Sequence, residues 1–135
     1  KNNGVSKAIR EFCVPLCATI HLSGSIISVT SFAVAVLMMN GMDHGFSTVF
    51  PFILMLGIAM VAAPGAPGGA IMSALPFLPR IGIPSDGGLA SLMIALYLTQ
   101  DSFGTAANVS GDNAIAAVVD HLNKKWSKKA DNKVA

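Results

Sequence analysis

The chain alternates long apolar runs with short polar breaks, and the longest run lies in its middle. Residues 45–79 contain no Asp, Glu, Lys or Arg. As one continuous helix this run would extend about 52 Å at ~1.5 Å per residue, well beyond a ~30 Å hydrocarbon core. Near its centre it is interrupted by Pro64, Pro67 and three glycines, which end helices. The pattern predicts a re-entrant helical hairpin over residues 46–79 with a Gly/Pro tip.

A second run without charged residues, 12–42, precedes the hairpin and predicts a transmembrane helix over residues 12–40. Five of the seven residues in the segment 19–25 are polar or glycine, in the middle of this apolar span. One interpretation is a discontinuous helix whose freed backbone groups face a binding site. The other is a continuous helix in which Ser and Thr hydroxyls bond to carbonyls of the preceding turn and Gly24 eases packing. The residues alone leave both open.

The last predicted helix, over residues 87–122, has one polar face. At ~100° per residue, three further polar side chains fall within about 40° of Asp101, so all four lie on one stripe. An Asp near the centre of a bilayer costs ~2.5–3.5 kcal/mol on insertion scales, so this face predicts a pathway for a cation or an ammonium group. The alternative is packing against polar groups elsewhere in a longer chain. The four residues of the stripe are Asp101, Thr105, Asn108 and Asp112.

Composition supports membrane insertion. The chain is 53% hydrophobic and 12% charged, against about 25% charged residues in soluble domains. A soluble helical domain is the alternative, but it would have few charges for its surface. Basic residues gather at the two ends and Arg80 alone lies between them, so the positive-inside rule predicts two crossings and two cytoplasmic termini. We therefore expect an integral protein of the plasma or inner membrane, in contact with the lipid bilayer, with residues 123–135 as a basic cytoplasmic tail.

Two crossings make too small a bundle to enclose a solute pathway. We therefore expect residues 1–122 to be the C-terminal part of a transport domain whose N-terminal remainder belongs to the same protein; a truncated reading frame is the alternative. No nucleophile–base pair or phosphate-binding loop is present in the sequence, which argues against an enzyme. The basic tail is interpreted as membrane-proximal, and no nucleic-acid partner is expected.

Three segments resemble motifs of one family. Residues 15–25 read Pro-Leu-Cys-Ala-Thr-Ile-His-Leu-Ser-Gly-Ser, residues 65–69 read Gly-Ala-Pro-Gly-Gly, and residues 108–112 read Asn-Val-Ser-Gly-Asp. In the same order they resemble the interrupted seventh helix, the tip of the second hairpin and the eighth helix of the dicarboxylate/amino acid:cation symporters, which include the glutamate transporters. The last match is the most specific. The resemblance implies an all-α membrane protein, namely the C-terminal transport core of a glutamate-transporter-like fold.

The resemblance also implies roles for individual residues. Asp112 would be a carboxylate ligand of Na⁺ near the backbone carbonyls of His21 and Asn108, and Thr19 would offer a carbonyl to a second sodium site. Asp101 would hold the amino group of the substrate, and Asn108 its carboxylate. The tip would close over the substrate as an outer gate. The substrate-binding set is then Asp101, Asn108, Thr105, Ala66, Pro67, Gly68 and Ser23.

Four positions depart from the family pattern. His21 and Ser23 replace an Asn and an Asp, so one sodium site loses its charge, and Leu22 replaces a Met. Gly104 replaces the Arg that binds acidic side chains, which favours a neutral substrate over an acidic one. His21 makes proton coupling an option, although a histidine that only packs in the core is the commoner case.

The resulting expectation is a secondary active symporter for an amino acid or dicarboxylate, coupled to Na⁺ or H⁺, with no covalent cofactor. The resemblance implies a homotrimer. The alternative is a channel-like or vestigial, non-transporting membrane protein of the same fold.

Overall fold

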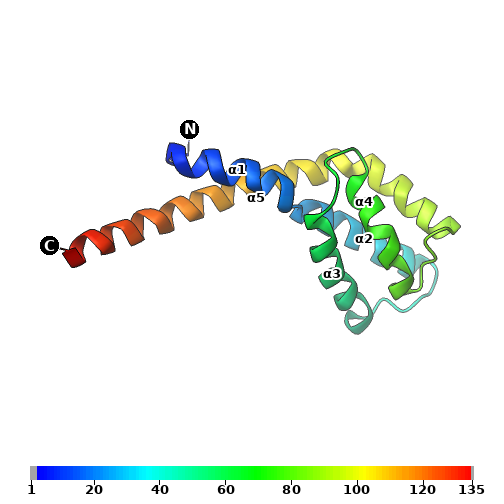
Figure 1. Ribbon diagram of the computed structural model, residues 1–135. Helices are drawn as coiled ribbons and strands as arrows, with labels where there is room; N and C mark the ends of the chain where they lie inside the picture. Colours follow the sequence, from blue (N-terminus) through cyan, green and yellow to red (C-terminus); the bar gives the residue numbers. More distant parts are fainter. Residues whose placement is uncertain (1–2, 135) are drawn as a thin grey trace.

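The computed structural model describes residues 3–134, with side chains described for residues 3–127 (Figure 1). All regular secondary structure in this range is helical, so the predicted all-α class is confirmed. The helices, in chain order, are α1 (Lys7–Ile20), α2 (Ser23–Met39), α3 (Phe46–Val61), α4 (Gly69–Ala74), the 3₁₀ helix η1 (Leu75–Ile81) and α5 (Gly88–Val134).

The first predicted span is interrupted between α1 and α2. His21 has an extended backbone, with φ −111° and ψ 94°, and α2 starts two residues later. The structure therefore agrees with a discontinuous helix. One feature of the alternative is present as well, because the Thr19 hydroxyl donates to the carbonyl of Leu16 at 2.7 Å. Judged by length and composition, the segment Lys7–Met39 could cross a membrane; within the described residues no other helix qualifies, and one such segment is weak evidence by itself.

The predicted hairpin is formed by α3, which packs against α4 and η1 on the returning arm. Its second arm differs from a plain α-helix. After Ala74 the chain continues as a 3₁₀ helix to Ile81, because Pro76 and Pro79 have no N–H to donate to an α-helical ladder. Figure 1 places the tip between α3 and α4 beside the first third of α5, where Gly68 contacts Asp101. Re-entry of this hairpin into a membrane stays a prediction.

The last helix is longer than predicted. We expected it to end near residue 122, but α5 continues through the basic segment to Val134. Lys residues are good helix formers, and they interact favourably with the negative C-terminal end of a helix. Asp120 also ties α5 to the start of the chain: it accepts the Ser6 backbone N–H at 3.2 Å and pairs with Lys124 at 2.5 Å.

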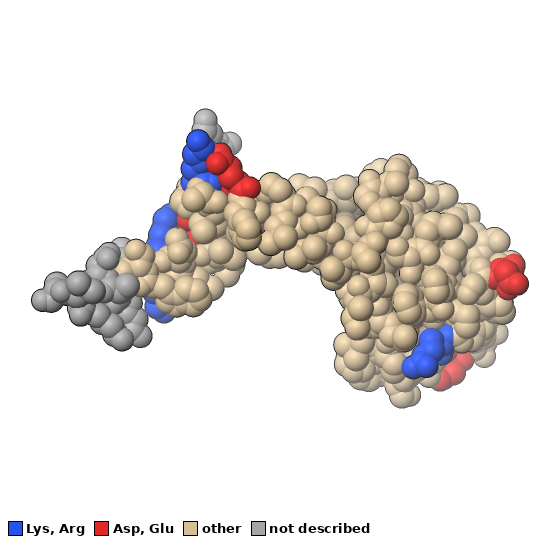
Figure 2. All heavy atoms as spheres, viewed as in Figure 1, with Lys and Arg blue, Asp and Glu red and all other residues tan. Residues whose placement is uncertain are grey.

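The core lies where α2, α3, α4 and α5 meet, and it positions the face of α5 that carries the polar stripe. Val29, Phe52, Ile71 and Tyr97 from these four helices are almost fully buried. Many other large apolar side chains are exposed, including Phe103 on α5. In Figure 2 the visible charged side chains lie toward the two ends of the molecule, with an uncharged surface between them. This distribution suits a protein whose middle contacts lipid or further protein.

Candidate functional site

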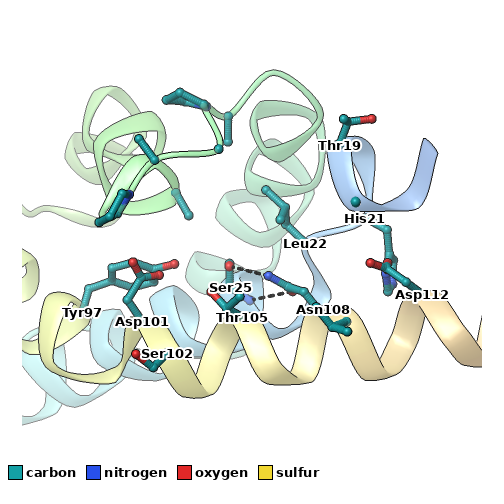
Figure 3. A pocket seen from close by; sticks show the side chains of 18 of the residues that line it. Thr19, His21, Leu22, Ser25, Tyr97, Asp101, Ser102, Thr105, Asn108 and Asp112 are labelled. Atoms are coloured by element: carbon teal, nitrogen blue, oxygen red, sulfur yellow. Dashed lines mark hydrogen bonds and ion pairs between the residues drawn. The ribbon is translucent and has the colours of Figure 1, made fainter. Parts of the chain in front are cut away.

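A cavity of about 740 Å³ lies where the helix break, the hairpin tip and α5 meet (Figure 3). The end of α1 and the start of α2 line one part of the cavity, and the hairpin tip lies across the cavity from α5. Segments far apart in the sequence therefore line one space. Its polar lining residues are Thr19, His21, Ser25, Tyr97, Asp101, Ser102, Thr105, Asn108 and Asp112.

The polar stripe of α5 forms one wall of the cavity. Asp101, Thr105, Asn108 and Asp112 all line it, as their helical spacing predicts. The two carboxylates differ in exposure: Asp112 is buried, with 3% of its surface accessible, whereas Asp101 is partly exposed. Each accepts a hydrogen bond from a different element. Figure 3 shows both side chains rising from the same helix, with Asn108 between them.

Asn108 holds the broken helix against α5. Its side-chain oxygen accepts the backbone N–H of Gly24 at 2.8 Å and of Ser25 at 3.3 Å, and its amide nitrogen donates to the Ser25 hydroxyl at 3.0 Å. The first N–H groups of a helix have no partner within it, and the N-cap residue Leu22 has no side chain that can accept. An amide from another helix therefore caps α2. Because this contact is buried, its loss would leave unsatisfied polar groups.

His21 and Asp112 form the second contact between the break and α5. The Nδ1 atom of His21 lies 2.9 Å from Oδ1 of Asp112. When this carboxylate is ionised it only accepts hydrogen bonds, and Nδ1 then carries the hydrogen of this bond. The extended backbone of His21 ends α1 and directs the ring toward α5.

The hairpin tip contacts the other carboxylate. The backbone N–H of Gly68 donates to Oδ2 of Asp101 at 3.0 Å. Gly68 has φ +75°, a left-handed conformation in which glycine is strongly favoured. Ala66 and Pro67 line the cavity just before it. The tip is therefore fastened through its backbone to a side chain that we predicted to bind the substrate.

Gly104 lies at a close crossing of α2 and α5. A Cβ built on Gly24 would stand 2.4 Å from the Gly104 carbonyl oxygen, so the two helices touch through their backbones. A Cβ on Gly104 would meet the Ser28 hydroxyl at 3.4 Å, and Gly104 is not among the residues that line the cavity. An arginine at this position would start against α2 and would have to bend around it to reach the cavity.

The structure brings most of the predicted site residues together. Ser23 lies outside the cavity lining, because the turn of α2 directs Leu22 and Ser25 toward it instead. Gly68 also lies outside the lining and reaches the site only through its N–H. Tyr97, Ser102 and Ser25 were missed. Tyr97 precedes Asp101 by four residues, one helical turn, so extending the stripe of α5 backwards would have found it.

The electrostatic character of the cavity favours a positively charged ligand. Two carboxylates line it, and its lining includes neither Lys nor Arg. Within residues 3–127, moreover, the structure brings no three His, Cys, Asp or Glu side chains together in a way that could hold a metal. A Na⁺ ion would therefore need backbone carbonyls or hydroxyls beside the carboxylates, and the end of α1 offers such carbonyls because they lack helical partners. An ammonium group would need only a carboxylate and nearby hydroxyls.

The fold and the site define an all-helical protein with a polar cavity built around a broken helix and a hairpin tip. Residues 1–122 match the sodium:dicarboxylate symporter family over their whole length, and the chain belongs to that family. The resemblance noted in the sequence is thus confirmed. The family consists of transporters and not of enzymes.

Individual relatives point the same way. The chain is 30% identical to neutral amino acid transporter A of Homo sapiens over all of its own length and 25% of the relative's. It is 30% identical to excitatory amino acid transporter 1 of Rattus norvegicus, over 97% of this chain and 24% of the relative. The chain thus spans about a quarter of the length of these relatives. No solved structure matches it significantly.

Proposed function

We propose that this chain forms part of the transport core of a secondary active symporter that carries a small amino acid or dicarboxylate across a membrane together with Na⁺ or H⁺. The observation that carries the proposal is the cavity, in which Asp101 and Asp112 stand on one helix, Asp101 beneath the hairpin tip and Asp112 beside the helix break. Two carboxylates without a lining Lys or Arg suit a pair of cationic groups, one on the substrate and one from the coupling ion.

The substrate would lie near Asp101. Its ammonium group would pair with this carboxylate, and its carboxylate would accept from the amide nitrogen of Asn108. That nitrogen carries two hydrogens, of which one is bonded to Ser25, so the other can serve the substrate. Thr105 and the tip residues Ala66 and Pro67 would enclose the remainder. The tip would open and close, because its bond to Asp101 competes with the ammonium group.

The coupling cation would lie near Asp112. A hard ion such as Na⁺ prefers oxygen ligands, and this carboxylate could act together with the backbone carbonyls of His21 and Asn108. The Thr19 carbonyl, at the end of α1, would serve a second sodium site, and the family's link to sodium supports this assignment. Coupling to H⁺ remains the other option.

A neutral amino acid is favoured over an acidic one. The cavity lining holds no cation for a second substrate carboxylate, and Gly104 faces α2. The relatives include both a neutral amino acid transporter and excitatory amino acid transporters, so the family by itself leaves the preference open. Replacing Gly104 by Arg should favour acidic substrates only if the new side chain bends around Ser28 into the cavity.

The membrane arrangement follows the charge pattern. Both termini of this segment would be cytoplasmic, with the hairpin entering and leaving from the outer side of a plasma or inner membrane. Figure 1 shows the two termini toward the same end of the molecule, which supports an even number of crossings. The N-terminal remainder of the transporter would complete the pathway, and the family resemblance favours a homotrimer.

Uptake by the full-length protein in lipid vesicles tests this proposal. Labelled neutral and acidic amino acids are offered with an inward Na⁺ gradient, with an inward H⁺ gradient, and with neither. Accumulation that requires one gradient and is lost in Asp101→Asn supports a symporter. Ionic currents that persist without a gradient-coupled substrate would instead support a channel-like protein of the same fold, and neither uptake nor current would indicate a vestigial one.

A further inference from the structure

The side chain of His21 is hydrogen-bonded to the carboxylate of Asp112, which is proposed to bind the coupling cation. Its Nδ1 atom is 2.9 Å from Oδ1 of Asp112, and the Asp112 side chain is only 5% exposed. Figure 3 shows the imidazole directed at this carboxylate from the break between α1 and α2.

The helix opposite His21 leaves space for the ring. A Cβ built on Gly111 would stand 2.5 Å from Cε1 of His21 and 3.4 Å from its Nδ1. Any side chain at position 111 would therefore push the imidazole away from its present place. The contact depends on two separate features of the chain, a glycine on α5 and an extended residue at the helix break.

A cation and the imidazole N–H compete for the same oxygen. An ionised carboxylate has no hydrogen of its own, and an N–H that points at Oδ1 places a partial positive charge where a metal ion would bind. A neutral ring must be moved or must share the oxygen, while a positively charged ring would also repel the ion. The direction of the effect on Na⁺ affinity is the same in both cases.

We infer that the His21 imidazole acts as a built-in competitor of the coupling cation at Asp112 and sets the concentration of Na⁺ at which the site fills. The inference rests on the proposed cation role of Asp112. The side chain of His21 would thus set the affinity for Na⁺, while its backbone carbonyl remains available as a ligand. Weaker Na⁺ binding is the expected consequence of the imidazole.

The test uses the full-length protein and measures the Na⁺ concentration that gives half-maximal effect in two assays. One is thermal stabilisation of the purified protein, with choline replacing Na⁺ at constant ionic strength. The other is uptake of a labelled amino acid into vesicles. His21→Asn removes the ring and keeps the backbone carbonyl. It should lower the half-maximal concentration about tenfold, because the free energy of one hydrogen bond to a charged group corresponds to at least a tenfold change in affinity.

A second variant and a control keep the result interpretable. Gly111→Ala retains His21 but displaces its ring, so it should shift the half-maximal concentration in the same direction by a smaller factor. His44→Asn changes an exposed histidine whose ring contacts the Met42 carbonyl in a turn, and it should leave the concentration unchanged.

The outcomes separate this inference from the proposed function. Sodium-driven uptake whose half-maximal concentration is the same or higher in both His21→Asn and Gly111→Ala overturns the inference alone. If the two variants need less Na⁺ than the parent protein for half-maximal thermal stabilisation, but no variant shows uptake, the inference is supported and the symporter is overturned. Absence of any response to Na⁺ in both assays, in the parent protein and the variants, overturns both.

Discussion

The helix break at His21 and the hairpin tip at residues 62–68 both approach α5, but α5 holds them in different ways. At the break, the buried side chain of Asn108 satisfies two backbone N–H groups of α2, and Asp112 holds the His21 ring. At the tip, one backbone N–H, that of Gly68, bonds to Asp101.

Burial follows the same division. The start of α2 is buried at Gly24 and Ser25, whereas residues 64–67 of the tip are exposed and are flanked by the partly buried Ala63 and the buried Gly68. Segments with few buried contacts open at low free-energy cost. The difference indicates that the break is a fixed part of the site, and that the tip is the part able to move.

Among the changes that test this difference between the break and the tip, loss of the Asn108 side chain should lower the stability of the protein most. Asn108→Ala leaves the N–H groups of Gly24 and Ser25 without an acceptor in a buried position, and each such group costs about 1–3 kcal/mol. We expect a destabilisation of about 3 kcal/mol, measured by unfolding of the full-length protein in detergent. Asn113→Ala is the control, since this exposed amide contacts only the carbonyl of Val109 on its own helix. Equal effects of the two substitutions would contradict a fixed break.

The close crossing of α2 and α5 gives the next largest effect. In Gly24→Ala the new Cβ would stand 2.4 Å from the Gly104 carbonyl oxygen, which is backbone and cannot rotate away. Separating the helices should cost about 2 kcal/mol, as overpacking generally does. Gly57→Ala provides a matched control, because nothing lies within 4 Å of its Cβ and alanine is the better helix former. Thermal unfolding should therefore show a lower midpoint for the first variant only.

The two carboxylates should affect different ligands. Asp112→Asn is expected to weaken the dependence on the cation about tenfold, and Asp101→Asn to weaken substrate binding about tenfold, which corresponds to ~1.4 kcal/mol for each. Half-maximal concentrations of cation and substrate are measured separately for each variant in vesicle uptake. If both variants changed both constants equally, the division between the break and the tip would be wrong.

The sequence predicts the elements of this site better than their contacts. Polar residues within an apolar span marked the segment 19–25 as unusual but left a broken and a continuous helix equally open, and the structure shows a break at His21 and Leu22. The helical period alone placed the four stripe residues on one wall. The extension of α5 beyond residue 122 escaped prediction because its Lys-rich sequence has no apolar periodicity, although its residues favour a helix.

Contacts between distant segments were beyond a sequence-based prediction. Nothing local indicates that Asn108 caps α2, because capping by another helix depends on how the two helices cross. Gly104 illustrates the same limit. It lies three residues from Asp101, close to the stripe in angle, yet α2 covers it and leaves Asp101 open to the cavity. Spacing defines a face of a helix, whereas packing decides which part of that face remains accessible.

The smallest effect is expected for a change at the tip, Gly68→Ala, which tests whether the backbone conformation of the tip matters for its closure. Gly68→Ala forces a Cβ into a left-handed conformation at φ +75°, at a cost of about 1 kcal/mol, and disturbs the N–H that Asp101 accepts. If the strain falls on the closed tip, the substrate concentration for half-maximal uptake should rise about fivefold, with little change in thermal stability. Gly65→Ala changes the same tip where a Cβ meets nothing within 4 Å, and it should behave like the parent protein. A large loss of stability in Gly68→Ala would instead make the tip as rigid a part of the site as the helix break.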